Sequence, residues 1–115
     1  MKASWNTGVF NDCITFLSTR EAVKKFSADH EDIDWGGEVG EKLEACTGVA
    51  FAAGEKGYCI GVFDKSLNTL IHESVHCAYS IVQARNLELG ECAETLAYLI
   101  ESIVAAGRER LKGIK

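Results

Sequence analysis

Two histidines and a glutamate in the second half of the chain have the spacing of a metal site. His72 and His76 stand four residues apart, and Glu73 follows the first of them. On a helix, side chains four residues apart share a face with their Cβ atoms about 5–6 Å apart, so both imidazoles can reach one ion. Glu73 is a residue type that takes a proton from a zinc-activated water, which is the chemistry of HExxH on a helix. The motif therefore predicts two zinc ligands, His72 and His76, and a general base, Glu73.

The third ligand has to come from elsewhere, because a catalytic zinc takes three protein ligands and leaves one position for water. Glu94 and Glu91 are the candidates, and 17 residues lie between His76 and Glu94. That interval allows the chain to turn at Gly90 and return as an antiparallel helix across the first one. We prefer Glu94, because Ala97 follows three residues later on the same face and lets two helices approach closely. Glu91, one turn earlier, stays the alternative.

Residues 67–83 are expected to form the helix that carries the motif. Asp64 or Ser66 can cap its first turn. Apolar residues recur at steps of three and four and predict the face turned toward the core. They are Leu67, Leu70, Ile71, Val75, Ala78 and Val82, while His72, His76, Tyr79 and Gln83 fall on an adjoining stripe.

A last helix is expected from Glu91 to about Lys112. Its predicted buried side consists of Leu96, Leu99, Ile100, Ile103 and Val104. Glu94, Ala97 and Glu101 lie together on a neighbouring side, where Glu101 is expected to support the site or face solvent. Cys77 and Cys92 are expected in the core rather than on the metal, because Cys77 points about 100° away from His76.

The first half of the chain predicts a small sheet and one early helix. Residues 13–17 have the composition of a strand, and the run from Ser18 to Glu21 matches a capping box that starts a helix. Residues 48–53 and 58–63 read as two strands joined by a hairpin turn at 54–57. The second of these strands ends just before the histidine helix. A strand edge near the site can pair with an extended peptide.

Residues 29–44 are acidic and rich in glycine, and they are expected to form a solvated loop with a short helix near 39–46. Asp32 and Asp34 invite a calcium interpretation. The spacing of these residues does not match that of a calcium-binding loop, because Gly36 occupies the fifth position and the residues that follow are out of register. His30, in the same segment, is expected to be exposed.

Composition narrows the class of protein. The chain has 115 residues, 47% of them hydrophobic and 25% charged, which predicts one globular domain over residues 1–115. A net charge of −5 disfavours nucleic acid, whose binding surfaces are basic. The sequence has no apolar run of about 20 residues and no apolar signal core, so neither a membrane span nor export is expected. Five cysteines without C-x-x-C spacing favour free thiols in a reducing cytoplasm.

The run from His72 to His76, followed by Glu94-Thr95-Leu96-Ala97, resembles the gluzincin branch of the zincin metallopeptidases. In that branch a glutamate on a following helix completes the HExxH site. The short chain also resembles small zincin-like proteins encoded by bacteriophages and prophages. The resemblance is specific over residues 64–101 and only topological before them. It implies zinc held by His72, His76 and Glu94, with Glu73 as general base.

Two departures from the gluzincin pattern change what the resemblance implies. Larger gluzincins often carry an aspartate four residues after the ligand glutamate, where this chain has Tyr98. The chain also lacks the additional domain that forms one wall of the substrate cleft, so its grip on substrate is weak or a partner supplies that wall. Tyr79 and Tyr98 are the candidate donors for oxyanion stabilisation.

These observations together predict an α+β, minimal zincin-like domain. It has a small sheet with a hairpin, one early helix, and two C-terminal helices that carry the metal. The expected function is a zinc-dependent metalloprotease acting on peptide or protein substrates in the cytoplasm. The alternatives are a non-catalytic, zinc-stabilised interaction protein and a zinc hydrolase acting on a non-peptide amide.

Overall fold

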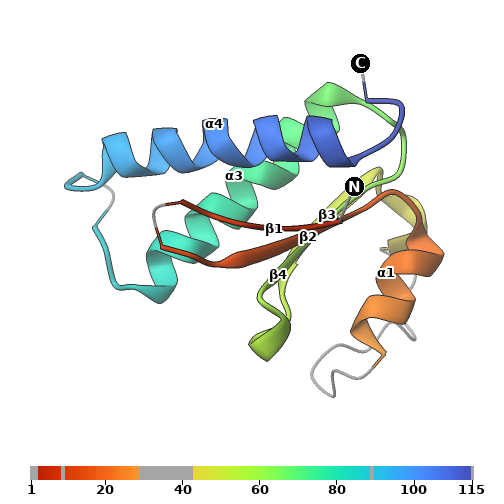
Figure 1. Ribbon diagram of the computed structural model, residues 1–115, viewed down its shortest axis with the longest axis horizontal. Helices are drawn as coiled ribbons and strands as arrows, with labels where there is room; N and C mark the ends of the chain where they lie inside the picture. Colours follow the sequence, from red (N-terminus) through yellow and green to blue (C-terminus); the bar gives the residue numbers. More distant parts are fainter. Residues whose placement is uncertain (1–2, 9, 29–42, 89, 115) are drawn as a thin grey trace.

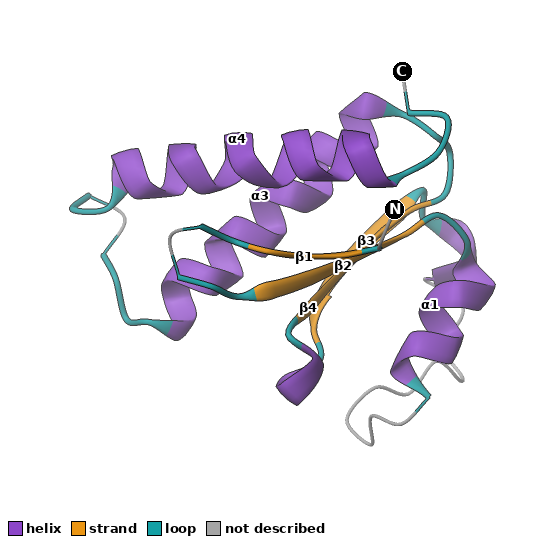
Figure 2. Cartoon of the chain, in the orientation of Figure 1, coloured by secondary structure: helices purple, strands orange, loops and turns teal. Residues whose placement is uncertain are grey.

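The computed structural model describes residues 3–8, 10–28, 43–88 and 90–114, and these residues form an α+β fold (Figures 1 and 2). The elements in chain order are β1 (Ser4–Asn6), β2 (Cys13–Leu17), α1 (Arg20–Ser27), β3 (Gly48–Ala52), the 3-10 turn η1 (Gly54–Lys56), β4 (Tyr58–Val62), α3 (Leu67–Ala84) and α4 (Ala93–Arg110). This confirms the predicted fold class. Among the helices of the described part, none has the length and apolar character needed to cross a membrane.

The four strands form one mixed sheet in the order β1-β2-β4-β3. β2 runs parallel to β4, while the outer strands β1 and β3 pair antiparallel with their neighbours. The predicted hairpin is confirmed as β3 and β4, and β1 is a strand that the sequence pattern did not predict. Gly57, with φ of 82°, is needed in the hairpin because a Cβ there would collide with the carbonyl oxygen of Cys13.

Helices cover both faces of the sheet, with α3 and α4 on one side and α1 on the other (Figure 1). Side chains alternate between these faces along each strand, as the pleat requires. Ile14 and Ile60 point into the larger core under α3 and α4, whereas Cys59 points toward Val23 of α1. The motif helix is thereby packed against the sheet and cannot rotate freely.

The early helix α1 begins one residue later than the predicted capping box requires. Thr19, not Ser18, is the N-cap, and its hydroxyl accepts a hydrogen bond from the backbone N–H of Ala22. Glu21 therefore does not take the reciprocal position of the box. The predicted acidic loop and His30 fall in residues 29–44, most of which lie outside the described residues; residues 43–45 form a helical turn.

The motif helix α3 is confirmed, with Ser66 as its N-cap, but its buried sector was predicted wrongly in part. Ile71 and Val75 were expected in the core and are 40% and 42% exposed. The buried positions are Leu70, Glu73, Ser74, Cys77, Ala78, Ile81 and Val82. Two of these side chains are polar, and for this reason the pattern of apolar residues pointed to a sector rotated away from the true one.

The last helix α4 packs on α3 and runs in the opposite direction (Figure 1). Leu99 and Ile103 are buried as predicted. Gly107 marks the closest approach, because a Cβ there would lie 2.6 Å from Cδ1 of Leu70 and 3.1 Å from Cε1 of Phe16. This contact fixes which residues of α4 lie opposite which residues of α3.

The far end of α3 is tied to the first two strands by Arg85. Its Nη1 lies 3.0 Å from Oδ2 of Asp12, and its guanidinium stacks 4.3 Å from the ring centroid of Phe10. The guanidinium also donates to the backbone oxygen of Phe10. Both ends of α3 are therefore held, since Ser66 caps the other end.

Candidate metal centre

His72 and His76 lie together on the solvent-facing side of α3. Their Nε2 atoms are 3.2 Å apart, and the ring centroids are 4.8 Å apart with the rings at 73° to each other. Both residues are exposed, and the His72 side chain retains 67% of its accessible surface. The helical spacing thus produces an open pair of imidazoles whose coordinating nitrogens converge.

The separation of the two nitrogens suits a tetrahedral metal ion. Zinc binds imidazole nitrogen at about 2.0–2.1 Å, so two nitrogens at a tetrahedral angle lie about 3.3 Å apart. The observed 3.2 Å matches this span without any rearrangement of the helix. Within the described residues, His72, Glu73 and His76 form the group of potential ligands that could hold a metal, with their ligand atoms within 4.8 Å of one another.

Glu73 lies beside the histidines but belongs to the buried side of the helix. Its Oε2 is 4.0 Å from Nε2 of His72, and its side chain is only 10% exposed. Burial raises the pKa of Glu73 above its ordinary value, and the neighbouring charges of His72 and His76 partly oppose this rise. A carboxylate with a raised pKa beside two imidazoles that could hold a metal ion is suited to accept and return a proton.

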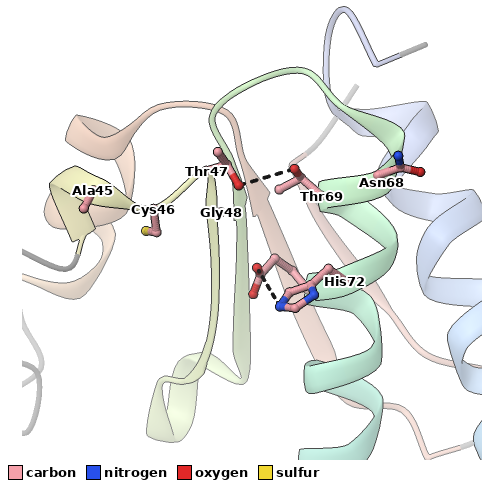
Figure 3. Close-up of a pocket in the computed structure, with 8 residues that line it drawn as sticks. Ala45, Cys46, Thr47, Gly48, Asn68, Thr69 and His72 are labelled. Carbon is pink, nitrogen blue, oxygen red and sulfur yellow. Dashed lines mark hydrogen bonds and ion pairs between the residues drawn. The ribbon is translucent and has the colours of Figure 1, made fainter.

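The other wall of the site is the start of β3, which approaches α3 very closely (Figure 3). A Cβ on Gly48 would lie 2.6 Å from Cγ2 of Thr69, 2.8 Å from the carbonyl oxygen of Gly61 and 3.0 Å from Cγ of Glu73. Only glycine fits there. An open hollow of about 540 Å³ lies along this junction, lined by Ala45, Cys46, Thr47, Gly48, Asn68, Thr69, His72 and Glu73.

At the rim of the hollow, Oγ1 of Thr69 on α3 lies 3.5 Å from Oγ1 of Thr47, the residue before β3 (Figure 3). The same hydroxyl donates to Oδ2 of Asp64, in the turn before α3, at 2.9 Å. Oδ1 of Asp64 accepts from the backbone N–H of Ser66, the residue that caps α3. The site is therefore built where the capped end of α3 meets the first residues of β3.

Arg20 positions the segment that leads into β3. Its Nε donates to the carbonyl oxygen of Leu43 at 3.0 Å, and its Nη2 donates to that of Cys46 at 2.6 Å. Its guanidinium lies 4.8 Å from the ring centroid of Phe63. The sequence pattern did not indicate that Arg20, Thr47 and Gly48 help to build the site. For Gly48 a signal exists, because a glycine that opens a strand indicates close approach of another element.

The structure does not bring Glu94 into the histidine group. Glu94 is exposed in the first turn of α4 and lines a separate hollow with Thr95, Ala97, Tyr98 and Glu101. The group of potential metal ligands within the described residues contains His72, Glu73 and His76 and does not include Glu94 or Glu101. Glu91 is exposed and precedes α4. The third ligand stays a prediction.

The two tyrosines considered as oxyanion donors are both exposed and lie on different helices. Tyr79 is on α3, three residues after His76, and Tyr98 is on α4 in the hollow that contains Glu94. Neither lines the hollow beside His72 and Glu73. An oxyanion role for either tyrosine stays a prediction.

Comparisons of this chain with protein-family models, with curated proteins and with solved structures find no match. The interpretation of the site therefore depends on the arrangement of its own residues.

Gly48→Ala is expected to destabilise the protein, because the added methyl group meets the backbone oxygen of Gly61 as well as two side chains of α3. The expected loss in the free energy of unfolding is about 1–3 kcal/mol, as for other overpacked sites, measured by urea denaturation. Gly90→Ala is the matched control, since a Cβ there meets no atom within 4 Å. Equal free energies of unfolding for the two variants would show that the protein accommodates a methyl group at Gly48 without loss of stability.

Glu73→Gln is expected to stabilise the metal-free protein near neutral pH. Because the pKa of Glu73 is raised in the folded state, the folded protein binds that proton more tightly than the unfolded chain does. The free energy of unfolding of the wild type should then fall as the pH rises from 4.5 toward the raised pKa. The Glu73→Gln variant cannot ionise at this position and should not show this fall. The measurement is urea denaturation in chelator across that range. A difference between the two proteins that does not change with pH contradicts the assignment.

Proposed function

We propose that this protein is a zinc-dependent metalloprotease, with Glu73 as the general base. The observation that carries the proposal is the pair of Nε2 atoms of His72 and His76, 3.2 Å apart, with the buried carboxylate of Glu73 beside them. Nitrogen ligands at this separation suit zinc. The five free thiols of the chain fit a reducing, cytoplasmic location as part of the proposal.

When bound, zinc supplies Lewis acidity that lowers the pKa of water and polarises a carbonyl group. His72 and His76 hold the ion by Nε2. Glu73 takes a proton from the attacking water on its carboxylate and delivers it to the leaving amine. The wall at Gly48 keeps bulk water from one side of Glu73, and this maintains the raised pKa that makes the return of the proton favourable.

An extended peptide is the proposed substrate because β3 is an outer strand of the sheet, and its first residue, Gly48, lines the hollow beside His72. A peptide added along a strand edge receives main-chain hydrogen bonds that do not depend on its sequence. Such binding fits an unfolded protein or a flexible segment, for which the backbone is accessible.

Protein purified without chelator is expected to contain zinc and to cleave an unfolded protein substrate. Glu73→Gln should keep the zinc and lose cleavage by at least about 100-fold, the usual range for loss of a general base. His76→Ala should lose both. Zinc content is measured by elemental analysis and cleavage by release of new amino termini. Retention of cleavage in Glu73→Gln contradicts the mechanism, and cleavage confined to a panel of non-peptide amides favours the alternative hydrolase.

Zinc affinity of three glutamate variants identifies the third ligand. We expect Glu94→Ala to weaken zinc binding at least about tenfold, as loss of a group that supports a zinc site does, while Glu91→Ala and Glu101→Ala stay near wild type. For Glu94 to bind, the first turns of α4 must move toward His76. If Glu101→Ala is instead the variant that weakens binding, Glu101 replaces Glu94 as the proposed third ligand.

A further inference from the structure

One side of the hollow is the short segment that leads into β3, and the other side is α3 (Figure 3). Ala45, Cys46 and Thr47 are the part of this segment that lines the hollow, and we call them the outer wall. Ala45 ends a helical turn over residues 43–45, while Cys46 and Thr47 belong to no helix or strand. Regular structure alone therefore does not set the positions of these residues, and contacts with other elements have to fix them.

The two ends of the outer wall are held in different ways. The carbonyl oxygen of Thr47 accepts a backbone hydrogen bond of 2.8 Å from the residue that follows β4. At the other end, Arg20 of α1 donates from Nε to the carbonyl oxygen of Leu43 at 3.0 Å and from Nη2 to that of Cys46 at 2.6 Å. One guanidinium thus joins two carbonyl groups three residues apart and spans the first part of the wall.

Arg20 is suited to this task because its guanidinium is a rigid, planar fork of donors. The ring centroid of Phe63 lies 4.8 Å from the guanidinium and limits the orientations of the fork. Lys24, one turn further along α1, reaches Oε1 of Glu44 at 2.7 Å, but these side chains are 43% and 59% exposed, so their ion pair contributes little. Of these two polar contacts between α1 and the segment, the fork of Arg20 is consequently the one that can fix the wall.

Arg20 acts on the hollow from outside it. Among the described residues that line the hollow, none belongs to α1, and α1 covers the face of the sheet opposite to α3 (Figure 1). Removal of the Arg20 side chain therefore leaves the lining of the hollow chemically unchanged. What it removes is the hydrogen bonding that holds the outer wall before a ligand arrives. A wall that has to be ordered at the moment of binding lowers the affinity for the ligand.

We propose that Arg20 is a positioning residue, which holds the outer wall in the shape that receives substrate and takes no part in the chemical step. The identity of the ligand as a peptide rests on the proposed function, whereas the hold of Arg20 on the wall does not. Loss of the fork should weaken substrate binding and leave turnover unchanged. This is the pattern expected when the lost interaction serves the ground state and the transition state equally.

Cys46 provides a readout of the wall that does not require activity. Its half-buried thiol donates to the carbonyl oxygen of Leu43 at 3.2 Å, the same oxygen that Arg20 holds. In Arg20→Ala, alkylation of Cys46 by iodoacetamide should become about tenfold faster, since one hydrogen bond to a charged group fewer opposes opening of the wall. Cys13, also half-buried but on β2, is the internal control, and its rate should not change. Peptide mass spectrometry of the full chain, alkylated in chelator, measures both rates.

Two further variants separate the fork from charge alone. Arg20→Lys keeps the positive charge but replaces the planar fork with a single ammonium group, so alkylation of Cys46 should be nearly as fast as in Arg20→Ala. Lys24→Ala is the matched control, because it removes a cation of α1 that contacts the same segment through an exposed ion pair, and its alkylation rate should stay near that of the wild type. Thr19, the N-cap of α1, is unchanged in all three variants. Circular dichroism verifies that each variant is folded.

Cleavage of fluorescein-labelled casein by the zinc-loaded protein tests the effect on substrate. Arg20→Ala should raise KM about tenfold and change kcat by less than about twofold, while Lys24→Ala should change neither. A lower kcat at unchanged KM overturns the positioning role. An unchanged alkylation rate of Cys46 in folded Arg20→Ala, an equal rise at Cys13, or a rate in Arg20→Lys equal to that of the wild type also overturns it. If the wild-type protein cleaves nothing, the proposed function is overturned, and alkylation of Cys46 alone then decides whether Arg20 holds the wall.

Discussion

The site depends on how closely α3 approaches the start of β3. At Gly48 the strand lies so near the helix that a single methyl group would meet both the helix and the backbone of the neighbouring strand. This approach buries Glu73 while His72 and His76, on the same turns, remain in solvent.

Burial of Glu73 is the electrostatic consequence of that packing. A carboxylate removed from water holds its proton more tightly, and the two imidazoles beside it limit the effect when they are charged. The helix thus places a group with a raised pKa next to an open pair of imidazole nitrogens that could hold a metal ion. Buried thiols nearby take no part in this chemistry, since burial raises the pKa of Cys77 to about 12 and keeps it protonated.

The rest of the fold holds this junction in place. Arg20 ties α1 to the residues that precede β3, and Arg85 ties the end of α3 to the first two strands. Gly107 sets how α4 lies along α3. The hollow beside His72 and Glu73 is open to solvent. The exposed residues of α3 beside this hollow include no Asp, Glu, Lys or Arg.

Local information was sufficient for part of this arrangement. The spacing of His72 and His76, the hairpin and the two C-terminal helices follow from side-chain periodicity and turn residues, which act over a few positions, and the structure confirms these elements. Which sector of α3 is buried depended instead on contacts between distant segments. Ile71 and Val75 proved exposed because the sheet and α4 bury a different sector of α3, one that contains the polar residues Glu73 and Ser74.

The sequence by itself determined which residues can bind a metal, because four-residue spacing on a helix converges two imidazoles wherever the helix is placed. Only the tertiary structure decided how these residues are surrounded. The contact between Gly107 and Leu70 sets where α4 packs on α3, and the contact at Gly48 packs the start of β3 against Glu73. Neither contact is encoded in local periodicity, because each depends on how elements far apart in the chain pack together.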